Sequence, residues 1–159
     1  MLAILNMEVS RESEARGEAG NCGTASPLKK QDYTFSSSLS LEQIRKKQNQ
    51  FSMERDWEQY HTPRNLLLAL VGEVGELSEI FQWKGEVDVG LPGWSHKDRA
   101  HVGEELSDIL IYLIELAEKC HIDLPSAVLR KFELNFKKYP PEKVYGSSKK
   151  YTEYISDDN

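Results

Sequence analysis

Residues 66–81 read LLLALVGEVGELSEIF and carry the clearest periodicity in the chain. Apolar residues recur there at intervals of three and four, which is the spacing of one face of an α-helix. Thr62 and Pro63 come just before this run. Proline is favoured in the first turn of a helix because the amide hydrogen that it lacks would have no partner there. The pattern predicts a helix from Thr62 to about Trp83.

Three further segments show the same helical period, and their predicted bounds are residues 41–57, 95–121 and 124–140. Ser40 with Gln43 is a capping-box pattern at the start of the first segment, and Ser95 can cap the second. A pair of prolines ends the third. No segment alternates in the manner of a β-strand, so the sequence predicts an all-α, antiparallel four-helix bundle. The wide apolar faces of the second and third helices predict association into an oligomer.

Length and composition indicate one domain with polar ends, because the 159 residues show sustained periodicity only in their central part. We expect a disordered arm over residues 1–39, the all-α domain over residues 40–141 and a flexible tail over residues 142–159. The net charge of −6 argues against broad binding to nucleic acid, and no apolar run is long enough to cross a membrane. Acidic N-terminal residues and two cysteines without metal spacing favour a cytoplasmic protein.

Two pairs of acids lie on the second and third predicted helices, Glu73 with Glu76 and Glu105 with Asp108. The i, i+3 spacing puts each pair on one side of its helix, with Cβ atoms about 5–6 Å apart. A chain this acidic contains such pairs by chance, so the hypothesis rests on their position beside the apolar stripe. Carboxylates that face an apolar interior need protons or a cation. Oxygen donors suit Mg²⁺, with Mn²⁺ as a possible substitute.

Other residues around these pairs have ordinary explanations. Glu79 and Glu115 extend the acid series, but glutamate is a common helix former, and we expect both on the solvated face. Gly72 and Gly75 each lower helix propensity by about 1 kcal/mol, which is understandable where another backbone or a ligand approaches closely. Tight packing between helices is the alternative for both glycines. Trp94, in a loop with glycine and proline, is expected to pack.

A second metal motif is present in Glu58-x-x-His61 and Glu118-x-x-His121, which match the pattern of ferritin-like di-iron bundles. On an ideal helix, the second of these pairs is rotated by about 140° from the acid pair of the third predicted helix. The two pairs therefore do not easily serve one site. A di-iron protein and a non-catalytic helical scaffold, with its acids as buried polar groups, are the two alternatives to a magnesium enzyme.

The acid pairs are accompanied by four short blocks, RDWEQ at residues 55–59, PRNLLL at 63–68, FQWK at 81–84 and CHIDLP at 120–125. Together they resemble the dCTP pyrophosphatase branch of the MazG-like all-α nucleoside triphosphate pyrophosphatases. The resemblance spans roughly residues 41–141. It implies a homotetrameric, Mg²⁺-dependent enzyme that hydrolyses dCTP and some modified analogues to the monophosphate and pyrophosphate, and so cleanses the nucleotide pool.

The same resemblance implies a set of site residues. By this resemblance, Glu73, Glu76, Glu105 and Asp108 bind the metal. Trp57 and Trp83 form the base pocket, and His61 and Tyr112 lie near the nucleotide. Lys131 and Asn135 contact the phosphates. Lys84 and Arg64 are further candidates to neutralise phosphate. Gln48 stands where that branch commonly has a nucleotide-contacting histidine, which keeps hydrogen bonding but loses a ring and a possible charge. A pyrophosphatase for another nucleoside triphosphate is therefore an alternative. Stacking of a nucleobase on Trp57 or Trp83 also follows from their positions at helix ends.

Overall fold

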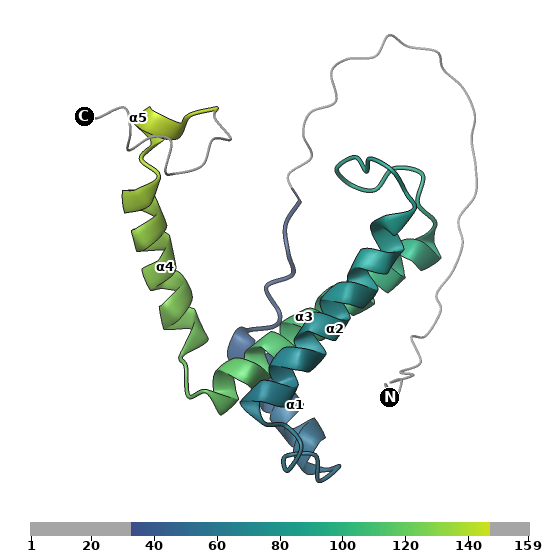
Figure 1. The fold of residues 1–159 in the computed structure, drawn as a ribbon, viewed down its shortest axis with the longest axis vertical. Helices are drawn as coiled ribbons and strands as arrows, with labels where there is room; N and C mark the ends of the chain where they lie inside the picture. The colour runs from purple at the N-terminus through teal and green to yellow at the C-terminus, as the bar shows by residue number, and fades with distance from the viewer. Residues whose placement is uncertain (1–32, 147–159) are drawn as a thin grey trace. The chain divides into compact units, whose positions relative to one another are not determined.

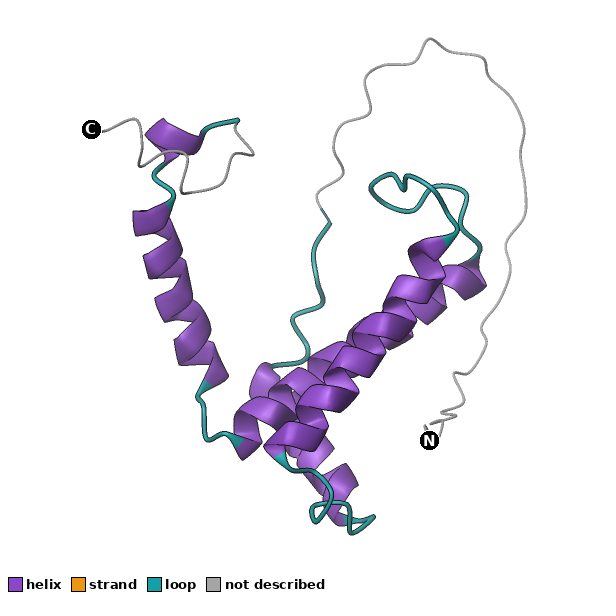
Figure 2. Ribbon diagram, in the orientation of Figure 1, coloured by secondary structure: helices purple, strands orange, loops and turns teal. Residues whose placement is uncertain are grey.

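The computed structural model describes residues 33–146, which contain helices and no strand (Figures 1 and 2). The helices are α1 (Leu41–Met53), α2 (Pro63–Gln82), α3 (His96–Lys119), α4 (Leu124–Lys138) and α5 (Pro141–Val144). The all-α prediction is confirmed. Most of the predicted arm over residues 1–39 and of the tail over residues 142–159 lies outside the described residues, so these boundaries stay predictions. None of the helices described is apolar enough over its length to cross a membrane.

The predicted helix starts are confirmed at atomic detail. Ser40 Oγ accepts a hydrogen bond from the Gln43 amide at 3.2 Å, and Gln43 Oε1 accepts one from the Ser40 amide at 2.7 Å. This reciprocal pair satisfies two amide groups that a helix start otherwise leaves unpaired. Thr62 caps α2 ahead of Pro63, and the Ser95 hydroxyl accepts from a first-turn amide of α3. Local sequence therefore determines where these helices begin.

Helix α1 ends at Met53, four residues before the predicted end at Trp57. The Trp57 amide donates to Ser52 O at 3.0 Å and the Asp56 amide to Met53 O at 3.1 Å. Asp56 has a φ of 54°, in the left-handed region. These features are those of a Schellman end, in which glycine usually takes the left-handed position. The prediction was too long because aspartate takes that position here. The early turn brings residues 57–61 back toward α1 and α3.

Helices α2 and α3 lie side by side and run in opposite directions, and α1 packs against α3 (Figure 1). At 1.5 Å per residue, α2 and α3 are about 30 and 36 Å long, so their shared face is the main interface of the fold. The most buried apolar side chains are Leu66, Val102, Ile114 and Ala117. All but Leu66 lie on α3, which makes α3 the central helix of this unit.

Helix α4 takes part in no interface of comparable extent among the described residues. Its apolar side chains are exposed, with Phe132 at 54% and Phe136 at 72%. The chain thus packs α1, α2 and α3 together, and α4 does not close the predicted four-helix bundle within one chain. The physical reason is that α4 has an apolar face, as predicted, but residues 33–146 offer that face no extensive partner.

Candidate active site

Three carboxylates meet between α2 and α3. Each of Glu73, Glu76 and Glu105 offers an oxygen, and these oxygens all lie within 4.8 Å of one another. The i, i+3 spacing puts Glu73 and Glu76 on one side of α2, and the antiparallel packing of α2 and α3 brings Glu105 opposite them. Within residues 33–146, no other group of acids, histidines or cysteines satisfies the same criterion. This acid cluster is the candidate metal site.

Two members of the acid cluster are buried. Glu73 is 4% exposed and Glu105 is 7% exposed, whereas Glu76 is exposed. The Oε2 atoms of Glu73 and Glu105 are buried without a hydrogen-bond partner in the described structure. Burying a carboxylate oxygen without a partner costs free energy, because the oxygen loses its hydrogen bonds to water and no other hydrogen bond replaces them. The cluster therefore has open positions for a cation.

The charges of the cluster repel one another. Burial, followed by the negative charges of Glu76, Asp108 and Glu105, raises the pKa of Glu73 above its usual value. Burial and the charges of Glu76 and Glu104 raise the pKa of Asp108 in the same way. Asp108 is not one of the three acids whose oxygens meet, but its charge interacts with those of Glu73 and Glu76. The four predicted acids therefore share one electrostatic environment, in which a proton or a cation is favourable.

Among the described residues, His101 is the basic side chain that contacts a carboxylate of this cluster. Its Nε2 lies 3.1 Å from Glu105 Oε1, one helical turn earlier on α3. Sequence reasoning missed this histidine, although its i, i+4 spacing from Glu105 is a usable signal. One exposed imidazole cannot neutralise four carboxylates. The donor set consists of carboxylate oxygens, two of which are buried without a partner, and it fits a hard divalent ion such as Mg²⁺.

Comparison with known proteins agrees with this geometry. The sequence profile of the MazG-like family matches residues 69–154, which include all four acids. The chain belongs to the MazG-like family. A solved structure of a pyrophosphatase from Archaeoglobus fulgidus is 34% identical, with a TM-score of 0.52 over 68% of this chain and 99% of that one. The resemblance drawn from the motifs is therefore confirmed.

Curated relatives of this MazG-like chain carry one name. The human protein dCTP pyrophosphatase 1 is 54% identical over 140 residues, which are 88% of this chain and 81% of the human protein. The mouse protein of the same name is 51% identical over 137 residues, which are 86% of this chain and 81% of the mouse protein. The similarity therefore extends over most of the chain and is not limited to the acid motif.

Three predicted substrate residues of this MazG-like chain lie together at the junction of α1 and α3. The His61 and Trp57 rings have centroids 6.0 Å apart, and Trp57 packs edge-on against Phe51 at 5.7 Å. Gln48 of α1 reaches the same region, where its Nε2 donates to Glu115 at 2.8 Å. The left-handed turn after α1 creates this arrangement by folding residues 57–61 back.

Glu115 corrects an expectation. We expected it on the solvated face with Glu79, yet Glu115 is 2% exposed, while Glu79 is exposed as expected. Glu115 accepts hydrogen bonds from Gln48 and Ser52, and its Oε1 lies 2.5 Å from His61 Nδ1. Helix propensity says nothing about which face a glutamate takes, so that argument was the wrong one. Spacing from the predicted acids offers a signal, because Glu115 follows Asp108 by seven residues, about two helical turns.

Tyr112 lies on α3 beside the acid cluster, where the charges of Glu73 and Asp108 act on it. The other predicted substrate residues are not brought to the acid cluster in the part of the chain that the structure describes. Trp83 follows α2 and is 86% exposed, while Lys84 pairs with Asp98 at 3.6 Å. The Lys84 ammonium also lies over the ring of Trp94, and Trp94 packs on Phe81 as expected for a packing residue. Lys131 and Asn135 lie on α4, whose contacts with the other helices are sparse. Their substrate contacts stay predictions.

The di-iron alternative finds no support in the geometry. Glu58 lies 3.5 Å from the Lys119 ammonium, and Glu118 lies 2.6 Å from the Arg45 guanidinium. Their carboxylates are thus paired with cations and not with each other. His121 is exposed in the turn that ends α3. The two Glu-x-x-His pairs do not meet in a common metal site.

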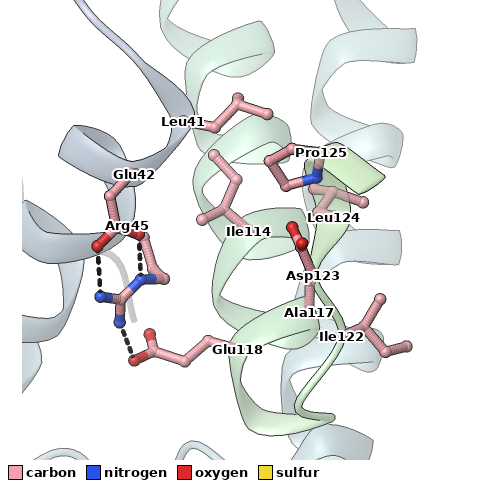
Figure 3. Close-up of a pocket in the computed structure, with 10 residues that line it drawn as sticks. All are labelled: Leu41, Glu42, Arg45, Ile114, Ala117, Glu118, Ile122, Asp123, Leu124 and Pro125. Carbon is pink, nitrogen blue, oxygen red and sulfur yellow. Dashed lines mark hydrogen bonds and ion pairs between the residues drawn. The ribbon is translucent and has the colours of Figure 1, made fainter. Parts of the chain in front are cut away.

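A separate pocket of about 340 Å³ lies where α1, the end of α3 and the start of α4 meet (Figure 3). Its lining includes Leu41, Ile114 and Leu124, and Arg45 bridges Glu42 and Glu118 at one side. No predicted site residue lines it. The acid cluster is the better candidate for chemistry, because it collects buried groups that need a ligand. The charged side chains of this pocket already have partners, Arg45 with Glu42 and Glu118, and Asp123 with Ser126.

Proposed function

We infer that this chain hydrolyses dCTP, and modified dCTP analogues, to the monophosphate and pyrophosphate, as an enzyme of nucleotide-pool sanitation. The observation that carries the inference is the acid cluster, found in a chain that is 54% identical to human dCTP pyrophosphatase 1. The mouse, rat and bovine relatives bear the same name at 51–56% identity. A scaffold function offers no reason to bury two carboxylate oxygens without partners.

We propose that Glu73, Glu76, Glu105 and Asp108 bind Mg²⁺, or Mn²⁺ in its place. Such an ion, when bound, neutralises triphosphate charge and makes the phosphorus a better electrophile. The two buried acids offer oxygens that have no other partner. Glu76 is exposed and is suited to meet substrate and water. A carboxylate of the cluster can orient the water that attacks the α-phosphorus and accept its proton, with Glu73 and Glu76 as the candidates.

The base pocket that we propose consists of Trp57 and Trp83, with Gln48, His61 and Tyr112 close to the nucleotide. Stacking of a base on an aromatic side chain contributes about 1–3 kcal/mol and does not select among bases. Selectivity must then come from hydrogen bonds. We also propose that Lys84, Lys131 and Asn135 contact the phosphates. Lys131 and Asn135 lie on α4, so their contacts require α4 to approach the acid cluster of its own chain or of another copy.

The proposed reaction is tested by incubating the full chain with Mg²⁺ and, in turn, dCTP, 5-methyl-dCTP, dTTP, dUTP and ATP. We expect dCMP and pyrophosphate as the products of dCTP, and no turnover after chelation of the metal. In water enriched in heavy oxygen, the label should enter dCMP, because attack occurs at the α-phosphorus. Label in pyrophosphate contradicts this mechanism. Preference for another triphosphate favours the alternative substrate, and inertness to all five favours a scaffold.

We also propose that the enzyme is a homotetramer. Apolar side chains on the outer faces of α2 and α3 are exposed in a single chain, with Val71 at 62% and Leu106 at 52%. A Cβ added at Gly72 or Gly75 would meet nothing within 4 Å, so these glycines leave room for an approaching helix or ligand. Large exposed apolar surfaces mark association sites. Sedimentation equilibrium should give four times the mass of 18.2 kDa, and a monomer at micromolar concentration contradicts the proposal.

The cytoplasm is the compartment that we propose for this reaction. Cys120 is a free, exposed thiol, which suits a reducing environment.

A further inference from the structure

Glu115 is a buried acid with no place in the reaction proposed above. It is 2% exposed, and Ser52 beside it is 1% exposed. Glu115 Oε1 accepts from the Ser52 hydroxyl at 3.2 Å and lies 2.5 Å from His61 Nδ1. Its Oε2 accepts from Gln48 Nε2 at 2.8 Å. Unlike the buried oxygens of the acid cluster, both oxygens of Glu115 have partners. Glu115 therefore needs no metal ion as a partner, and its hydrogen bonds order the side chains of Gln48, Ser52 and His61.

The carboxylate determines which atoms its neighbours present. An ionised carboxylate can only accept hydrogen bonds, so the amide of Gln48 must turn its Nε2 toward Glu115. Its Oε1 is then left as an acceptor, and among the described residues no donor occupies it. By the same argument His61 carries a proton on Nδ1, and among the described residues its Nε2 has no hydrogen-bond partner. One buried charge thus fixes the hydrogen-bonding direction of two side chains.

The position of Glu115 on α3 connects this network to the acid cluster. Glu105, Asp108, Tyr112 and Glu115 follow one another at intervals of three, four and three residues, so they share one face of α3. Glu115 is about 10 Å along the helix from Asp108. Tyr112 lies between them, and burial together with the charges of Glu73, Asp108 and Glu115 raises its pKa. A nucleotide whose phosphates lie at the acid cluster can therefore extend toward Gln48 and His61.

We propose that Glu115 is a positioning residue that sets base selectivity by holding the Gln48 carbonyl oxygen toward the nucleobase. This inference rests on the proposed function. Cytosine presents an amino group at its 4-position, where uracil and thymine present a carbonyl oxygen. A fixed acceptor on the protein pairs with the amino group and repels the carbonyl. The selectivity therefore comes from an amide whose orientation a buried carboxylate enforces, and not from a charged base contact.

The test compares dCTP with dUTP, in which a carbonyl oxygen replaces the 4-amino group and N3 carries a hydrogen. In Glu115→Gln, residue 115 can donate as well as accept, so the Gln48 amide can turn over. We expect the ratio of kcat/KM for dCTP to that for dUTP to fall by at least about tenfold, the effect of one lost or unpaired hydrogen bond. Release of pyrophosphate from dUTP should rise or stay constant. Glu118→Gln is the matched control, because Glu118 is one turn away and binds Arg45 and Asn49.

A spectroscopic measurement separates positioning from general damage. Nitrogen NMR of the folded protein should show His61 protonated on Nδ1 in the wild type and in Glu118→Gln, and a changed pattern in Glu115→Gln. If Glu115→Gln does not fold, Gln48→Met tests the same claim, because it removes the carbonyl oxygen and leaves Glu115 in place. An unchanged substrate ratio in either folded variant overturns the proposal.

Failure of the proposed function has a different signature. If the wild-type chain releases no pyrophosphate from dCTP with Mg²⁺, the reaction itself is wrong, and the His61 spectrum still decides whether Glu115 orders its neighbours. If the wild type prefers dCTP and the folded Glu115→Gln keeps the wild-type ratio, the reaction stands and Glu115 is not a positioning residue for the base.

Discussion

Replacing Glu76 by glutamine is expected to lower Mg²⁺-dependent release of pyrophosphate from dCTP by at least about a hundredfold. Glutamine keeps the size of the side chain but replaces a charged oxygen donor by a neutral amide, which is a poor ligand for a hard cation. The fold should be intact, because Glu76 is exposed and its charge repels those of Glu73 and Asp108. Removing that charge reduces the electrostatic repulsion among the carboxylates when no metal is bound.

The matched control is Glu79→Gln, which makes the same change one turn further along α2. Glu79 is exposed and outside the acid cluster, so this variant should keep the wild-type rate. Initial rates at saturating dCTP and a titration of Mg²⁺ measure both variants, and circular dichroism verifies their folds. Wild-type turnover by Glu76→Gln, or an equal loss in the Glu79 control, removes the metal role from the acid cluster.

The second large effect concerns stability. Leu66 is 1% exposed, the most buried apolar side chain of α2 in the described structure. Replacing it by alanine removes the apolar contacts of a leucine side chain and leaves a cavity that the surrounding helices can fill only in part. We expect the free energy of unfolding to fall by about 2–5 kcal/mol. Urea denaturation measures it, at one fixed protein concentration because association adds to apparent stability.

Leu39→Ala serves as the control for this substitution. Leu39 precedes α1 and is 52% exposed, so its truncation should change the free energy of unfolding by no more than about 0.5 kcal/mol. A loss of less than about 1 kcal/mol in Leu66→Ala contradicts the packing of α2 described here. The slope of the unfolding free energy against urea concentration should be the same in both variants, which shows that each exposes a similar surface on unfolding.

Several elements were predictable because their causes are local. The hydroxyls of Ser40, Thr62 and Ser95 cap helices through bonds to amides three residues later, and nothing distant is needed. The end of α1 was missed for a local reason too, since Asp56 takes a conformation that glycine usually takes. The i, i+3 acid pairs were visible as pairs on one face of each helix.

What the chain alone determined is therefore the set of helices, their starts and the face on which each acid lies, because these depend on bonds and periodicity within one element. Tertiary structure decided which faces meet. The antiparallel packing of α2 and α3 brings Glu105 within 4.8 Å of Glu73 and Glu76, and the packing of α1 on α3 buries Glu115 among Gln48, Ser52 and His61. A glutamate has the same local propensities in water and in a buried network, so its role is established only by the helix packed against it.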